Sequence, residues 1–199
     1  MKLLGSNRSP YAFKVMVMIT EKGLVCDFEA SATSSAEVAE ANPLSKIPVL
    51  IRDDGKVLYD SSVIVDYLDG LVPTPKLIPD AFEDRIEVKR WEALGDGIMD
   101  AAVAISHADR VPAAEQNAHK AKQQKKIDAS LAAMEKDLGN GKFCHCDGFT
   151  LADIACGCAL VCLDIRAADT DWRQTHPALA HHAERMAIRE SFKLAGSAD

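Results

Sequence analysis

Two serine residues stand where a helix is expected to begin, and each could interact with a negatively charged ligand. Ser9 precedes Pro10 and Tyr11, while Ser61 follows Asp60. The first turn of a helix has unpaired N–H groups and carries the positive end of the helix dipole, so it stabilises an anion. Serine and aspartate are also favoured helix caps. Ser9 and Ser61 can therefore have either role, helix cap or ligand-binding residue, and one helix end can serve both.

A third place of interest is a proline that directly precedes an expected strand. It lies in the stretch NPLSKIPVL at residues 42–50, where Pro48 follows Ile47. Asn42 and Pro43 end the short helix before it. From these residues alone, Pro48 can be an ordinary proline at the start of a strand.

The six cysteines favour reduced thiols rather than a disulfide framework or a metal centre. Five of them lie in the last third of the chain, and no signal peptide precedes them. Cys144 and Cys146 flank His145, but this spacing lacks a second ligand pair of the usual kind, so we expect no metal. Cys158 and Cys162 lie four residues apart in an apolar helical run, as small buried hydrophobic residues do.

The composition excludes several classes of protein. Hydrophobic residues make up 48% of the 199-residue chain and charged residues 27%, which suffices for a packed core. The formal net charge of -7 argues against a general nucleic-acid-binding protein, which usually has a basic face. Near the N-terminus the longest apolar run, Val15 to Ile19, is too short for a signal core or a membrane span. We therefore expect a cytoplasmic protein with no membrane or nucleic-acid partner.

The first part of the chain alternates between strand and helix patterns. Gly23 closes the first helix, and Asp53-Asp54-Gly55 forms a hairpin turn. The expected elements are a strand at 2–4, a helix at 11–22, a strand at 24–30, a short helix ending at 41, strands at 48–52 and 56–59, and a helix from 60 or 61 to about 68. This β-α-β-α-β-β-α order predicts a sheet with one parallel pair and a closing antiparallel hairpin.

No strand pattern follows residues 71–79, which contain three prolines and suggest a linker. Four helices are expected after it, at 82–107, 113–138, 151–164 and 177–188. The third is almost entirely apolar and should be the central buried helix. At its start, Thr150 and Asp153 have the N-cap and N3 spacing of a capping box, with Asp in place of the usual Glu. The fold class is thus an α/β N-terminal domain followed by an all-α helical bundle, with domains at 1–75 and 82–199.

Three motifs in this order resemble those of the cytosolic glutathione transferases, specifically bacterial members with a serine-type site. They are the stretch 42–50, Asp60-Ser61-Ser62 before an apolar helix, and GFTLADI at 148–154. The strand, loop and Ser9-Pro10-Tyr11 start are similar to thioredoxin and glutaredoxin, where cysteine stands in place of Ser9. The resemblance implies a thioredoxin-like fold for the first domain. It also implies that the thiolate comes from a bound ligand.

The resemblance further implies a role for each matching residue, with glutathione as co-substrate. The Ile47-Pro48 bond would be cis, so that the main chain of Ile47 pairs with the cysteinyl part of glutathione. Asp60 would bind the γ-glutamyl ammonium group, and Ser61 the neighbouring carboxylate. Ser9 would donate a hydrogen bond to the sulfur and act as the catalytic residue. Tyr11 is the second hydroxyl to consider.

Family members are generally homodimers, so a homodimer is expected, with a small, hydrophobic electrophile as the other substrate. One departure is Phe13, where many bacterial relatives have a basic residue.

Two other functions stay open. The first is a glutathione-binding or interaction protein without catalysis, which the intact glutathione motifs disfavour. The second is a glutathione-dependent thiol–disulfide oxidoreductase, which usually has cysteine at the position of Ser9.

Overall fold

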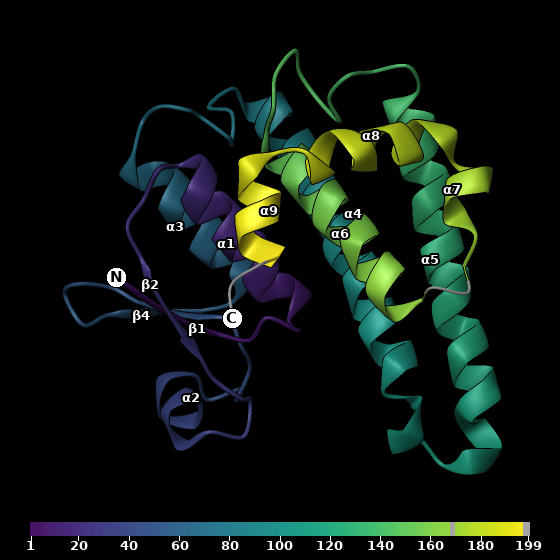
Figure 1. Cartoon of the computed structure of the whole chain (residues 1–199), viewed down its shortest axis with the longest axis horizontal. Helices are drawn as coiled ribbons and strands as arrows, with labels where there is room; N and C mark the ends of the chain where they lie inside the picture. Colours follow the sequence, from purple (N-terminus) through teal and green to yellow (C-terminus); the bar gives the residue numbers. More distant parts are fainter. Residues whose placement is uncertain (168–169, 197–199) are drawn as a thin grey trace. The chain divides into compact units, whose positions relative to one another are not determined.

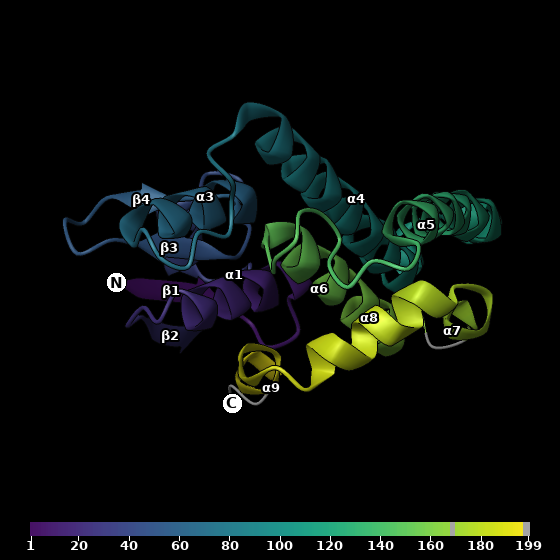
Figure 2. The same ribbon diagram turned by 90° about the horizontal axis from the view of Figure 1, so that it is seen from above.

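A computed structural model describes residues 1–167 and 170–196 (Figures 1 and 2). The described chain forms two compact units. The first contains Met1–Ile78 together with the described residues from Ile188 onward, and the second contains Pro79–Ala187.

The first unit is built on a four-stranded mixed sheet. Its strands are β1 (Lys2–Gly5), β2 (Asp27–Ala30), β3 (Val49–Ile51) and β4 (Val57–Leu58), in the order β2-β1-β3-β4. β1 pairs with β2 in parallel and with β3 antiparallel, and β3 and β4 form the hairpin. The expected element order and mixed sheet are therefore confirmed. At the turn, Gly55 has a φ of 79°, which side chains other than glycine's rarely allow.

Helices cover both faces of this sheet. Leu4 and Val49 are paired across β1 and β3 and pack with Val38 of α2 (Ala36–Ala41). Because neighbouring side chains of a strand point to opposite faces, Leu3 and Leu50 face the other side. There α1 (Pro10–Glu21) and α3 (Ser61–Leu71) pack against each other, as Figure 1 shows. The two helices that carry the candidate serines thus share one face of the sheet.

A short C-terminal helix, α9 (Glu190–Gly196), packs on α1 in this unit. The ring of Phe192 meets that of Phe13 edge to face, with centroids 5.7 Å apart. Both side-chain N–H groups of Arg189 that face Glu21 donate to its carboxylate at 2.8 Å, and the Ser191 hydroxyl donates at 2.5 Å. These contacts hold α9 against α1 within the first unit.

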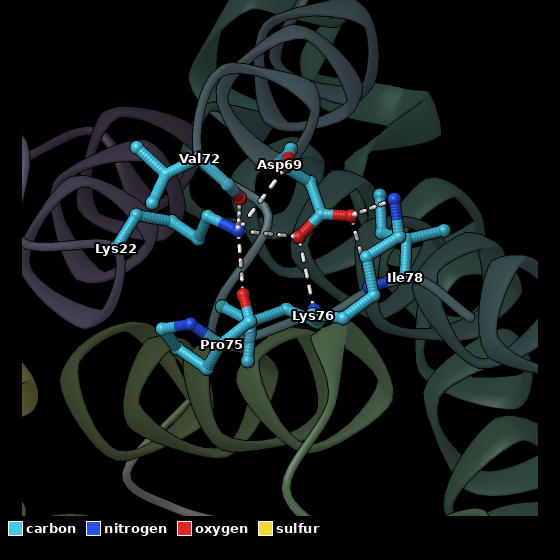
Figure 3. A network of polar contacts seen from close by, with 7 residues as sticks. Lys22, Asp69, Val72, Pro75, Lys76 and Ile78 are labelled. Carbon is cyan, nitrogen blue, oxygen red and sulfur yellow. Dashed lines mark hydrogen bonds and ion pairs between the residues drawn. The ribbon is translucent and has the colours of Figure 1, made fainter. Parts of the chain in front are cut away.

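The segment expected to be a linker is held tightly against the first unit (Figure 3). Lys22, the C-cap of α1, donates to the main-chain carbonyls of Val72 and Pro75 at 2.5 Å and to the carboxylate of Asp69 at 3.0 Å. The same carboxylate accepts the N–H groups of Leu77 at 2.9 Å and of Ile78 at 3.2 Å. One buried ion pair therefore supplies hydrogen-bond partners for a segment without regular structure.

The second unit is helical. Its helices are α4 (Phe82–Ser106), α5 (Gln116–Leu138), α6 (Leu151–Arg166), α7 (Trp172–Thr175) and α8 (Pro177–Ala187), with 3₁₀ turns at Ala108–Arg110 and Ala113–Glu115. α6 is buried along most of its length and packs closely on α4, which confirms it as the central helix. The short α7 and α9 have no counterpart in the sequence-based prediction. Of the helices described, none has the length and apolar character needed to cross a membrane.

The predicted capping box at the start of α6 is confirmed. The Thr150 hydroxyl accepts the N–H of Ala152 at 3.2 Å, and the Asp153 carboxylate accepts the N–H of Thr150 at 2.9 Å. Asp153 also accepts the N–H of Cys144 at 2.9 Å, so the same carboxylate holds the loop before α6.

Candidate functional site

The three candidate segments leave the sheet of the first unit at the same edge. β1 ends at Gly5 and leads to Ser9, and the start of antiparallel β3 lies beside that end, since Leu4 is paired with Val49. β4 ends at Leu58, which is paired with Leu50 near the start of β3. Ile47 precedes β3, and Asp60 follows β4. The direction of the strands thus places all three segments at one edge.

Ser9 is the N-cap of α1, and its geometry leaves the hydroxyl able to donate. The Ser9 Oγ accepts the N–H of Ala12 at 3.2 Å, and Pro10 is the first residue of the helix. A hydroxyl group has two acceptor lone pairs and one O–H donor, so capping uses an acceptor position only. The side chain is half-buried. Ser9 can therefore cap the helix and donate a hydrogen bond to an anion at the same time.

Asp60 and Ser61 form the corresponding start of α3. Asp60 is the N-cap, and its Oδ1 accepts the Ser62 hydroxyl at 2.6 Å and the Ser62 N–H at 3.1 Å. Ser61 is the first residue of the helix and only 4% exposed. A buried hydroxyl beside an exposed carboxylate, both at the positive end of a helix, can hold a zwitterionic group.

The pKa of Asp60 lies below its usual range. The main cause is the hydrogen bond from the Ser62 hydroxyl, and the positive charges of Lys14 and Lys46 act in the same direction. Asp60 is therefore ionised at neutral pH and suited to an ammonium group. Lys14 belongs to α1 and Lys46 precedes Ile47, so both of the other candidate segments carry a positive charge that favours the ionised carboxylate.

The Ile47-Pro48 bond is cis, as expected. The loop before it is held by the buried Asn42, whose side-chain amide donates to the Lys46 carbonyl at 2.9 Å and accepts the Leu44 N–H at 3.0 Å. The Ile47 side chain packs against the cluster formed by Leu4, Val38 and Val49. Ile47 lies before the first residue of β3, outside the ladder with β1.

The sequence did not indicate that Lys14 lies near the candidate site, and it did not explain why Phe13 stands where a basic residue is expected. Lys14 is fully buried on α1, and its charge acts on Asp60. A single lysine among apolar residues of a helix is the signal that could have found it. Phe13, which departs from the expected basic residue, packs on Phe192 of α9. The other hydroxyl candidate, Tyr11, is half-buried within α1.

Comparison with known proteins decides the family. A family model of the glutathione S-transferase N-terminal domain matches residues 3–76, and one of the C-terminal domain matches residues 115–185. The GST-like protein YibF of Escherichia coli (strain K12) is 35% identical over 195 residues, which cover 96% of each chain. The chain belongs to the glutathione S-transferase family.

Two solved structures of glutathione S-transferase family members are similar along nearly the whole chain. One, from Methylobacillus flagellatus with glutathione bound, is 47% identical, with a TM-score of 0.93 and 98% of each chain covered. The other, from Pseudomonas fluorescens Pf-5 with glutathione bound, is 36% identical, with a TM-score of 0.87 over 98% of this chain and 97% of that one. For this glutathione S-transferase family member, the thioredoxin-like fold of the first domain and the helical fold of the second are therefore confirmed.

Proposed function

We propose that this protein is a glutathione transferase that activates the thiol of glutathione for attack on a small, hydrophobic electrophile. In this proposal residues 1–75 form the glutathione-binding domain and residues 82–199 the helical domain. The observation that carries it is the position of Ser9, whose hydroxyl caps α1 and keeps its proton available for a bound sulfur. The relatives crystallised with glutathione support the choice of ligand.

Each end of glutathione has a proposed partner. The ammonium of the γ-glutamyl group binds the ionised Asp60, and its carboxylate binds the hydroxyl of Ser61 at the start of α3. The main chain of Ile47, next to the cis Pro48, pairs with the cysteinyl residue as an added strand. The cysteinyl sulfur then meets the start of α1 and Ser9.

The proposed chemistry is nucleophilic substitution or addition by the bound thiolate. A free thiol has a pKa of about 8.5, so most of it is protonated at neutral pH, and the thiolate is the nucleophile. A hydrogen bond to a charged group contributes about 1.5–3 kcal/mol, which lowers a pKa by about one to two units. Ser9 would supply this hydrogen bond, and the sulfur would form a bond to the electrophilic carbon. In a substitution the leaving group departs with its bonding electrons, and in an addition the electron pair of the attacked double bond moves away from that carbon and takes up a proton from water.

Substitution of the two serines should separate binding from chemistry. Ser9→Ala should raise the pH midpoint of thiolate formation, followed by ultraviolet absorbance of the bound sulfur, and slow turnover by about tenfold to a hundredfold. Its glutathione affinity should stay near that of the wild type. Ser61→Ala should mainly weaken glutathione affinity, because its contact is shared by the ground and transition states.

A matched control distinguishes capping from catalysis. Ser35 caps α2 in the same way, with its Oγ accepting the N–H of Val38 at 3.2 Å. Ser35→Ala should lose about 0.5–2 kcal/mol of stability, as any lost cap does, and leave the thiol midpoint and the rate unchanged. If Ser9→Ala behaves like Ser35→Ala, Ser9 is only a cap and Tyr11 is the next hydroxyl to test. Glutathione binding without turnover on a panel of electrophiles, hydroperoxides and mixed disulfides would favour the non-catalytic alternative.

We also propose a homodimer. The resemblance to the family suggests it, and α4 presents two exposed apolar side chains one turn apart, Phe82 at 71% and Ile86 at 47% exposure. Light scattering at micromolar concentration should give twice the 21.5 kDa of one chain. Phe82→Glu should shift the mass toward one chain, while the same change at the exposed Ile165 of α6 should not. A wild-type mass of 21.5 kDa would contradict the proposal.

A further inference from the structure

Three side chains of the kind that bind zinc meet inside the helical unit. They are Cys144 in the loop before α6, Cys156 on α6 and His182 on α8. All three are buried, and their sulfur and nitrogen atoms lie within 4.8 Å of one another. The proposed glutathione chemistry uses none of them, and no disulfide involves either cysteine.

One pair of these atoms has a spacing close to that of two ligands in a tetrahedral site. The Sγ of Cys144 lies 3.9 Å from the Nε2 of His182. Ligands at the usual Zn–S and Zn–N lengths, about 2.3 and 2.0–2.1 Å, are about 3.6 Å apart at a tetrahedral angle. Side-chain shifts of a few tenths of an ångström would bring this pair to the separation required.

The charges of the three side chains also suit a divalent ion. Zn²⁺ bound by two thiolates and one imidazole carries no net charge, which a buried site tolerates well.

Neighbouring groups can orient the histidine. When Nε2 binds a metal, the ring proton lies on Nδ1, and a carboxylate or carbonyl usually accepts it. The Oδ1 of Asp153 lies 3.9 Å from Nδ1 of His182. The guanidinium of Arg185 lies 3.5 Å from the same nitrogen, and because it can only donate a hydrogen bond, it must turn away when Nδ1 carries the proton. Asp153 is already held in place by Thr150 and by the N–H of Cys144.

A second set of three groups, Asp84, His145 and Cys146, is less suitable. The Nε2 of His145 is 3.0 Å from the carboxylate of Asp84, so the nitrogen and the oxygen are already paired with each other. Cys146 is exposed and supplies the only sulfur of this set. Two thiols and a neutral imidazole out of water form the stronger set of zinc ligands.

We propose that Cys144, Cys156 and His182 form a structural zinc site that ties the loop before α6 to α6 and α8. Binding releases the two thiol protons to solvent as two Zn–S bonds form, so no oxidant or reductant is needed. The fourth ligand is an oxygen, from water or from the Asp153 main-chain carbonyl, which lies 3.4 Å from Nε2 of His182. The site lies within the helical unit and does not depend on the proposed glutathione chemistry.

The test uses the full-length, reduced protein and Co²⁺, a spectroscopic substitute for Zn²⁺. Titration without oxygen should give one equivalent of tetrahedral Co²⁺ with a thiolate-to-metal charge-transfer band of two-sulfur intensity, displaced by Zn²⁺. Cys144→Ala and Cys156→Ala should each lose stoichiometric binding. Cys162→Ala is the matched control, since this residue is a buried cysteine on the same helix outside the set. It should bind as the wild type does.

The outcomes separate the proposal from its alternatives. Loss of the band in Cys146→Ala would place the ion at the set with Asp84 and His145 and overturn the proposal. So would a wild-type spectrum with one thiolate or none. The wild-type titration stays decisive even if Cys156→Ala fails to fold, because the band intensity itself counts the sulfur ligands. Circular dichroism of each variant confirms that the helices are intact.

Discussion

Replacing Asp69 by asparagine should destabilise the first unit by about 3–5 kcal/mol, because it leaves a buried lysine charge without its partner. The Lys22 side chain is 0% exposed and that of Asp69 3%, so water cannot compensate for the lost carboxylate. Asparagine can accept one of the hydrogen bonds now made by the carboxylate, but its NH₂ group would face N–H donors. An effect of this size is a large part of the 5–15 kcal/mol that typically stabilises a domain.

The loss should be concentrated around the segment 72–78, whose main chain depends on this ion pair (Figure 3). Urea unfolding by circular dichroism measures the total loss, and amide hydrogen exchange should show faster opening at Leu77 and Ile78. Asp137→Asn is the surface control. Asp137 pairs with Arg90 at 2.8 Å in a partly exposed position, so its removal should change stability by no more than about 1 kcal/mol. Equal losses in the two variants would contradict the argument.

Much of the fold could be predicted because its signals are local. The Asp-Asp-Gly turn, the glycine after α1 and the capping box before α6 each act within a few residues, and all three are confirmed. α9 could not be found in this way. It is seven residues long, and its position depends on Phe13 and Glu21, which lie more than 160 residues earlier in the chain. Nothing in the local pattern of residues 190–196 indicates these partners.

The candidate site shows the same division between local and distant signals. Ser9 and Asp60 could be proposed because helix caps have a recognisable local sequence, and both are caps. Their common location follows from strand direction, which only the pairing of β1, β3 and β4 reveals. The proposed set of Cys144, Cys156 and His182 has no recognisable motif, because zinc motifs have short, regular spacings, while these residues lie in a loop and on two different helices.

Introducing a methyl group at Gly95 should cost about 3 kcal/mol, because α4 packs directly against the main chain of α6 there. A Cβ at this position would lie 2.7 Å from the main-chain oxygen of Ala155 and 3.0 Å from its carbonyl carbon. These atoms belong to the backbone of the buried α6, so they cannot move aside as a flexible side chain could. The helices must separate instead, which loosens the core of the second unit.

Gly97 provides the control, two residues along the same helix. A Cβ there meets no atom within 4 Å, so Gly97→Ala should stabilise the protein by about 0.5–1 kcal/mol through helix propensity alone. Gly95→Ala makes the same gain in propensity, so the difference between the two variants isolates the contact with Ala155. Both tryptophans, Trp91 and Trp172, are buried in the second unit, and their fluorescence therefore reports its unfolding in urea. If Gly95→Ala is as stable as Gly97→Ala, the two helices can separate without loss, and close packing at this glycine does not stabilise the unit.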